Sequence, residues 1–200
     1  MPCTGLEPAR QNIMPQSEES LKRYYAARAR EYERIYAKPE RQADLERLKA
    51  LLPPMFAGRR VIEVACGTGY WTQFLARQAG SIVAVDANLE TLEIAAEKSW
   101  PAGRVDFRVA DAYALPEELG MFDAAFAGFW GSHVAAGNRS RFLCSLHRRL
   151  LPGARVGEDR VAERGAAGAC PRTADPRQQQ ANEPLHVVDV GVKRRHHFFD

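Results

Sequence analysis

The chain has no long apolar run and little cysteine. None of its apolar stretches approaches the roughly 20 residues that a membrane-spanning helix needs. Residues 1–5 show neither the basic region nor the apolar core of a signal peptide. The four cysteines lie far apart and form no C-x-x-C pair, which argues against a disulfide framework or a zinc site. We therefore expect a cytoplasmic protein without a metal and without membrane contact.

The chain also lacks a concentration of positive charge. Its 28 Lys and Arg residues exceed its 25 Asp and Glu residues by only three, and acids are interleaved among them. This weak, dispersed charge does not predict nucleic-acid binding. A hydrophobic content of 46% over 200 residues is typical of one soluble domain. We expect a monomer or a homodimer, a state that the sequence itself does not specify.

Three segments of the chain differ in character. Residues 1–16 have no hydrophobic periodicity and predict a disordered tail, whereas residues 17–156 predict one domain with lid helices at its start. Residues 157–200 predict a poorly ordered segment, because only the stretch 185–190 has a strand-like apolar pattern. The change after Val156 is abrupt. It suggests, as a hypothesis, a shifted reading frame or a divergent terminus.

Short apolar strands alternate with helical patterns through the middle of the chain. The expected strands are 61–64, 81–86, 105–111 and 122–129, with a fifth after the turn at 152–156. The expected helices are one from residue 17 to about 36, then 43–52, 70–79, 89–98 and 138–151. This alternation predicts right-handed βαβ crossovers. The fold class is therefore α/β: a Rossmann-like, doubly wound, mostly parallel sheet with helices on both faces, incomplete at its C-terminal strands.

The stretch 61–72, VIEVACGTGYWT, organises the chain as a buried strand, a glycine turn and the start of a helix. Gly67 and Gly69 would let the backbone approach a ligand without an intervening Cβ. Dinucleotide-binding loops need a third small residue, a position that Thr72 occupies here after the bulky Tyr70 and Trp71. The turn therefore favours a nucleoside ligand smaller than a dinucleotide.

Three acids lie in or at the ends of the expected strands. Glu63 lies in the first strand, Asp86 ends the second and Asp111 ends the third. Because parallel strands share one carboxyl edge, we expect these side chains to converge there. A carboxylate after the second strand could accept hydrogen bonds from ribose hydroxyls, and one after the third could accept from an adenine amino group. Either could instead cap a helix.

The motif Glu63–Gly69, EVACGTG, resembles the first motif of class I S-adenosylmethionine-dependent methyltransferases. Four later stretches resemble further motifs of that family in the same order, over residues 20–156 in all: Val85–Asp86, Ala110–Ala112, Phe122–Ala124 and Leu150–Ala154. The resemblance implies S-adenosylmethionine as cofactor and S-adenosylhomocysteine as product. It also implies a set of cofactor-binding residues: Glu63, Ala65, Gly67, Gly69, Asp86, Ala87, Asp111 and Ala112.

The resemblance further implies a small-molecule methyl acceptor, since the D/N-P-P-Y motif of many amino-group methyltransferases is absent. Residues 129–133 resemble the acceptor-facing loop of the family. Trp130, Tyr24 and Tyr32 are candidate substrate or lid residues, although the tyrosine-rich face of the first helix could equally pack on the domain. His133 is a candidate general base, and a hydrogen-bonding or capping role is its alternative.

Methyl transfer is an in-line displacement that requires alignment and exclusion of water more than it requires a base. Two alternatives to a small-molecule methyltransferase remain open. The unusual C-terminal segment would suit an S-adenosylmethionine-binding module that is non-catalytic or impaired. The second alternative is a nicotinamide-dependent oxidoreductase, a function that Glu63 and Thr72 disfavour.

Overall fold

The computed structural model of the protein describes residues 18–130, 134–158 and 186–189. Its centre is a six-stranded sheet in the order β3-β2-β1-β4-β5-β6, and each neighbouring pair of strands is parallel. The strands are β1 (Arg60–Val64), β2 (Ser81–Asp86), β3 (Val105–Val109), β4 (Phe122–Ala127), β5 (Leu150–Glu158) and β6 (His186–Asp189). The Rossmann-like α/β fold expected from the sequence is confirmed.

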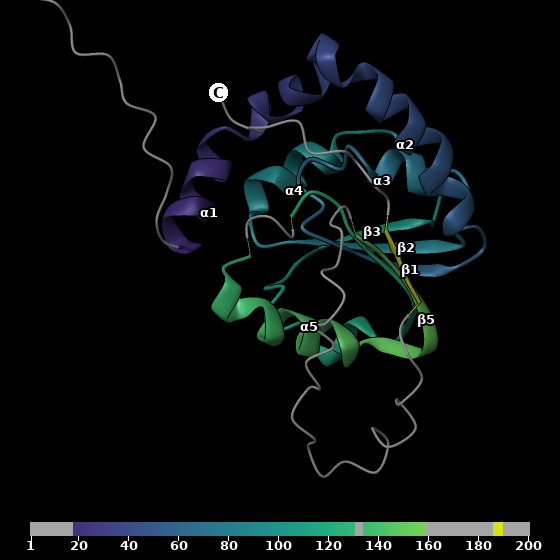
Figure 1. The fold of residues 1–200 in the computed structure, drawn as a ribbon. Coiled ribbons are helices and arrows are strands. Elements are labelled where there is room, and N and C mark those ends of the chain that lie inside the picture. The colour runs from purple at the N-terminus through teal and green to yellow at the C-terminus, as the bar shows by residue number, and fades with distance from the viewer. Residues whose placement is uncertain (1–17, 131–133, 159–185, 190–200) are drawn as a thin grey trace, which may run out of the picture.

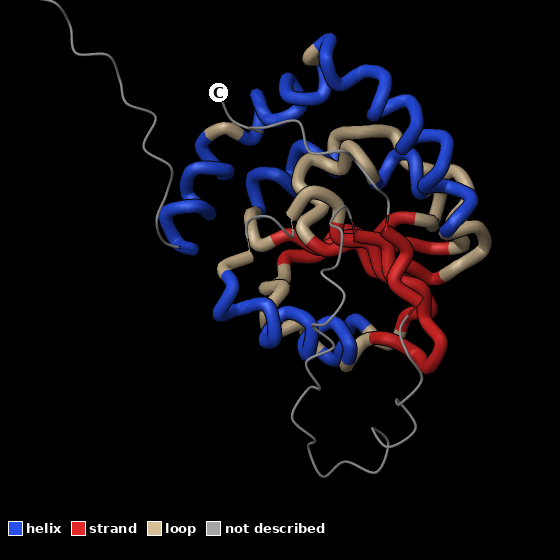
Figure 2. The backbone as a smooth tube through the Cα atoms, viewed as in Figure 1, coloured by secondary structure: helices blue, strands red, loops and turns tan. Residues whose placement is uncertain are grey.

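Helices cover both faces of this sheet (Figures 1 and 2). One face carries α2 (Gln42–Met55), α3 (Thr72–Leu75) and α4 (Leu89–Ala96), and the opposite face carries α5 (Arg139–His147). The N-terminal helix α1 (Glu18–Ala27) packs against α4. Shorter 3₁₀ turns connect these elements: η1 (Ala29–Ala37), η2 (Pro39–Arg41), η3 (Glu117–Leu119) and η5 (Ala136–Asn138). No helix in the described part of the chain is long and apolar enough to cross a bilayer.

The two helical layers create two apolar cores. Successive side chains of a strand point to opposite faces, so a strand covered on both faces is apolar at most of its positions. Val61 accordingly packs with Leu52 and Leu75 on the α2–α3 side, while Ile62 packs with Phe142 on the α5 side. All five of these side chains are buried. The apolar character of Val61, Ile62 and Val64 therefore reflects the central place of β1 in the sheet, and the buried Glu63 is the exception.

The strand order reverses between β1 and β4. From β1 the chain moves outward through β2 to β3 and then returns to place β4 on the other side of β1. Glu63 thus pairs in register with Ala84 of β2 and with Phe126 of β4. In open α/β sheets, ligands bind outside the carboxyl ends of the strands at such a switch point. The glycine turn follows β1 at this location.

Two expected helices differ from the structure near the N-terminus. The region from residue 17 to about 36, expected as one helix, forms α1 and then the 3₁₀ turn η1. Pro53 and Pro54, expected to end a helix, lie inside the last turn of α2. Their carbonyls still accept hydrogen bonds, from the N–H groups of Phe56 and Ala57. A proline in the last turn of a helix lacks a backbone N–H, but its carbonyl can still accept a hydrogen bond from the residues that follow.

Two further helix boundaries expected from the sequence were wrong. The expected helix 70–79 is reduced to α3, with turns on either side. Leu150 and Leu151, assigned to a helix over 138–151, belong to β5, where Leu150 is buried and pairs with Phe122. The strand-like pattern at 185–190 corresponds to β6, which pairs with β5. The expected tail over 1–16 lies outside the described residues, as does most of 157–200.

Candidate cofactor site

The turn after β1 has an unusual backbone. Ala65, Gly67 and Gly69 have φ angles of +55°, +56° and +76°. Glycine adopts such angles readily, but an alanine pays about 1–2 kcal/mol. The N–H of Gly69 donates to the carbonyl of Cys66 at 3.0 Å, which closes the turn. A strained non-glycine residue at a switch point is the kind of feature that marks a functional loop.

Gly69 is also required by its surroundings. A Cβ at this position would lie 3.0 Å from the Trp100 ring and 3.3 Å from the Cβ of Ala95. The indole N–H of Trp100 donates to the carbonyl of Ala95 at 2.9 Å, which fixes the ring in this place. The loop after α4 therefore packs directly on the glycine turn. Sequence reasoning missed Trp100, because nothing in its local pattern points to Gly69.

Asp86 connects the end of β2 to the glycine turn. Its Oδ2 accepts a hydrogen bond from the N–H of Gly67 at 2.9 Å, and its Oδ1 accepts from the N–H of Asn88 at 2.9 Å. Burial raises the pKa of Asp86, and these hydrogen bonds oppose the shift. Asn88 immediately precedes α4, so Asp86 also supports the start of that helix. Each carboxylate oxygen retains acceptor capacity for a ligand hydroxyl.

Glu63 is an enclosed acid beneath the turn. Burial raises the pKa of Glu63 to about 8, the charge of Asp86 adds to this shift, and the nearby Thr72 hydroxyl opposes it. Within the described chain, neither Oε2 of Glu63 nor Oγ1 of Thr72 completes a hydrogen bond. A buried carboxyl with a raised pKa and an unsatisfied oxygen is typical of a ligand site.

Asp111 lies at the same edge of the sheet, but it is more open than Asp86. Its side chain is 55% exposed, and Oδ1 accepts from the N–H of Tyr113 at 2.9 Å. Arg141 approaches its Oδ2 to 3.9 Å. The N–H of Ala110 donates to the carbonyl of Asp86 at 3.0 Å, which places the ends of β2 and β3 side by side. The half-buried Ala112 follows Asp111.

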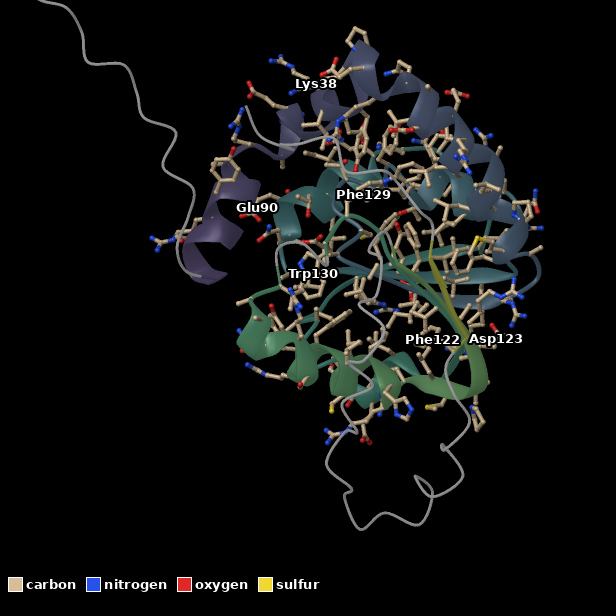
Figure 3. All side chains as sticks on the ribbon, viewed as in Figure 1. Lys38, Glu90, Phe122, Asp123, Phe129 and Trp130 are labelled. Atoms are coloured by element: carbon tan, nitrogen blue, oxygen red, sulfur yellow. The ribbon has the colours of Figure 1, made fainter. Side chains whose placement is uncertain are left out.

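Two aromatic residues follow β4 and diverge into different layers. Phe129, at a φ of +60°, stacks on Trp71 with ring centroids 5.5 Å apart. Trp130 packs on Phe142 of α5 at 4.7 Å and lies near the ring of Tyr113 at 5.7 Å. Figure 3 shows this pair at the opposite end of β4 from Phe122 and Asp123. The candidate base His133 lies outside the described residues.

The N-terminal segment packs on the glycine turn through aromatic rings. Tyr36 of η1 stacks on Tyr70 with centroids 3.6 Å apart and an interplanar angle of 7°. Packing of this face on the domain is thus observed, whereas a lid function for it stays a prediction. Tyr24 accepts a hydrogen bond from Nη1 of Arg28 at 2.6 Å. Tyr32 lies in η1, and its side chain is outside the description.

Sequence reasoning also missed Glu33. Its Oε1 accepts a hydrogen bond from Oγ1 of Thr68, the residue between the two glycines of the turn. Glu33 precedes Tyr36 by three residues, a spacing that places both on one side of a helical segment. That spacing is the signal that could have identified it.

Cys66 lies in the glycine turn between Ala65 and Gly67. Burial raises the pKa of the Cys66 thiol well above its usual range, with the charges of Glu63 and Asp86 adding to the effect. The thiol is therefore protonated, which is typical of a buried cysteine that serves packing. In the described part of the chain, no three His, Cys, Asp or Glu side chains gather as a metal site would require.

The match to a known family covers the chain from β1 to the beginning of β5. Residues 61–153 match the family model described as a methyltransferase domain. A solved structure of DhpI in complex with S-adenosylhomocysteine superposes with a TM-score of 0.57 at 33% identity, over 68% of this chain and 65% of DhpI. Residues 61–153 therefore belong to the class I S-adenosylmethionine-dependent methyltransferase family.

Individual relatives extend the likeness to named enzymes. Magnesium-protoporphyrin O-methyltransferase of Rhodobacter capsulatus is 35% identical over 100 residues, which are 49% of this chain and 44% of that protein. The chain spans about half the length of the curated relatives it matches, or less. The [4+2]-cyclase SpnF also superposes, with a TM-score of 0.57 at 25% identity over 74% of this chain and 63% of SpnF. The fold therefore carries more than one kind of chemistry.

Proposed function

We propose that this chain binds S-adenosylmethionine at the carboxyl ends of β1, β2 and β3 and transfers its methyl group to a small-molecule acceptor. The observation that carries the proposal is the hydrogen bond between Gly67 and Asp86, because it joins the glycine turn to a carboxylate at the switch point of the sheet. The DhpI complex with S-adenosylhomocysteine supports the same choice of cofactor.

The residues at this edge fit such a cofactor. Gly67 and Gly69 would contact its methionine part, and the remaining acceptor capacity of Asp86 suits the two ribose hydroxyls. Asp111 and Ala112 would contact the adenine. Ala65 and Ala87 would complete the wall beside Gly67 and Asp86. The buried oxygen of Glu63 is an acceptor that the ammonium group of the cofactor, or a water bound to it, could satisfy.

S-adenosylmethionine supplies a methyl group on a positively charged sulfur, which already activates it for displacement. The task of the chain is then to hold the acceptor in line and to keep water out. Four aromatic rings beside the glycine turn support exclusion of water, because each contacts the next: Tyr36 stacks on Tyr70, Tyr70 meets Trp71 edge-on, and Trp71 stacks on Phe129. We propose Tyr24, Tyr32 and Trp130 as lid or acceptor-facing residues. His133 is the proposed base for acceptors that must lose a proton.

A small-molecule acceptor is supported by two observations. The relative in Rhodobacter capsulatus is named for a magnesium porphyrin, and the D/N-P-P-Y motif is absent from this sequence. We also propose a cytoplasmic location and a monomeric or dimeric state, without a nucleic-acid or membrane partner. Cys66 is a free buried thiol, which suits a reducing compartment.

Two measurements on the full chain test the proposal. Titration calorimetry should show S-adenosylhomocysteine binding, and S-adenosylmethionine labelled in its methyl group should transfer label to at least one member of a panel of phenols, carboxylates, amines and quinols. Absence of S-adenosylhomocysteine binding would contradict the proposed cofactor site. Binding without transfer to any acceptor would favour a second candidate, a cofactor-binding protein without methyl transfer, which the likeness to the cyclase SpnF keeps open.

A further inference from the structure

We propose that Glu33 is a positioning residue that holds the glycine turn in the shape that binds the cofactor. Glu33 belongs to η1 and lies outside the stretch 61–153 that matches the methyltransferase domain. Its Oε1 accepts the hydrogen bond of Thr68 Oγ1 at 2.7 Å, and Thr68 is only 1% exposed. The inference rests on the proposed function, because it assigns Glu33 a role in the same cofactor site.

The same carboxylate oxygen of Glu33 also pairs with the ammonium group of Lys98, just after α4. One side chain therefore connects three segments that are distant in sequence: η1, the glycine turn and the end of α4. Lys98 thereby brings a positive charge to the carboxylate that holds Thr68. A hydrogen bond to a carboxylate is shorter and stronger than one between neutral groups, so the contact from Thr68 to Glu33 is of the stronger kind.

Aromatic packing fixes η1 beside this junction. Tyr36, one turn after Glu33, stacks on Tyr70, two residues beyond Thr68. Gln42 donates its Nε2 hydrogens to the carbonyls of Tyr36, at 2.8 Å, and Lys38, at 3.0 Å, which ties the end of η1 to α2. The carboxylate of Glu33 is thus presented by a segment that is itself held in place.

The turn needs such support because its backbone is strained. Ala65, Gly67 and Gly69 all have positive φ angles, and conformations of this kind persist only when surrounding contacts determine them. Removal of Glu33 would leave the buried hydroxyl of Thr68 without this partner. An unpaired buried hydroxyl favours rearrangement of the loop that carries it. The turn would then have to recover its shape whenever the cofactor binds, and affinity would fall.

A double-mutant cycle on the full chain tests this role, with S-adenosylhomocysteine as the probe and calorimetry well below the melting temperature. Glu33→Ala and Thr68→Val should each weaken binding roughly tenfold, and the double variant should be little weaker than either one. Glu33→Gln keeps a carbonyl oxygen and Thr68→Ser keeps a hydroxyl, so each should stay within about threefold of the wild type. Glu31→Gln is the matched control: Glu31 is an exposed acid of η1 that pairs with Arg28 and Arg34, so this variant should bind normally.

The outcomes separate this inference from the proposed function. Wild-type protein that binds no S-adenosylhomocysteine contradicts the proposed cofactor site. Two results with a wild type that binds would contradict the positioning role. One is wild-type affinity in Glu33→Ala and Thr68→Val, and the other is a loss of affinity in the double variant that equals the sum of the two single losses. If Glu33→Ala does not fold, the comparison of Thr68→Val with Thr68→Ser decides, and equal affinities for these two variants contradict the role.

Discussion

The backbone N–H of Gly67 donates to Oδ2 of Asp86 at 2.9 Å, which joins the turn after β1 to the end of β2. The other carboxylate oxygen accepts from the N–H of Asn88, just before α4. One acid therefore fixes two loops at the point where the strand order reverses. A ligand hydroxyl that binds Asp86 would meet a carboxylate whose orientation is already set, and preorganisation of this kind favours binding.

Replacement of Asp86 should weaken the cofactor site directly. We expect Asp86→Ala to reduce the affinity for S-adenosylhomocysteine by on the order of 1–3 kcal/mol, because buried donors lose their acceptor. Calorimetry measures this loss. The control is Asp106→Ala on β3, which removes an exposed carboxylate that pairs with Arg108 and should leave affinity unchanged. An Asp86→Ala variant with wild-type affinity would remove Asp86 from the ribose-binding role.

Glu63 should make stability depend on pH. Its pKa is about 8 in the folded protein and lies near the ordinary value of 4.5 in the unfolded chain. Between these values the folded state binds the extra proton, so the free energy of unfolding falls as pH rises. The contribution is complete below about pH 4.5 and is lost progressively up to about pH 8. The slope should approach 1.4 kcal/mol per pH unit at most.

Urea denaturation at pH 6 and pH 8 checks this prediction. Glu63→Gln mimics the protonated acid, so it should remove most of the decline between the two values. Equal pH slopes for the wild type and Glu63→Gln would show that another group is responsible. Asp86 is the neighbouring group to examine in that case, because burial raises its pKa as well.

Gly69→Ala should cost more stability than a second glycine substitution at a similar φ. Gly69 has a φ of +76° and its Cβ would meet Trp100 at 3.0 Å, whereas Gly103 has a φ of +68° with no atom within 4 Å. We expect about 1 kcal/mol for Gly103→Ala, from backbone strain alone. Gly69→Ala should cost roughly 1–3 kcal/mol and should also weaken S-adenosylhomocysteine binding. Equal losses of stability in thermal or urea denaturation would show that Trp100 yields without cost.

Adjacent leucines of α2 provide a test of its packing on the sheet. Leu52 is 1% exposed within the core on the α2–α3 face, while Leu51 is 48% exposed. Leu52→Ala should reduce the free energy of unfolding by about 2–5 kcal/mol. Leu51→Ala should change it by no more than about 0.5 kcal/mol. Similar effects of the two substitutions in urea denaturation would contradict the orientation of α2.

The sequence predicted those elements of the fold in which consecutive residues are buried or half-buried, as in the central strands of the sheet. β1 and β2 were located to within one residue, because strands buried on both faces form short, largely apolar runs. The placement of Glu63 and Asp86 near the glycine turn followed from the shared edge of parallel strands. The confirmed family match rests on these same residues.

The parts that it missed depend on contacts between distant segments. The hydrogen bond from Thr68 to Glu33 spans 35 positions, and the Cβ clash that Gly69 avoids comes from Trp100. No local pattern encodes either contact. Leu150 was assigned to a helix because helical spacing continues through it, whereas pairing with Phe122 in the sheet decides its conformation. Tertiary contacts prevail over local spacing at such boundaries.

The central claim is that the glycine turn and Asp86 form a site for S-adenosylmethionine. It is tested most directly by calorimetric titration of the full wild-type chain and Asp86→Ala with S-adenosylhomocysteine and, separately, with NADH. The account predicts that the wild type binds S-adenosylhomocysteine, that Asp86→Ala binds it more weakly, and that neither binds NADH. Tight binding of NADH by the wild type, without binding of S-adenosylhomocysteine, would contradict it.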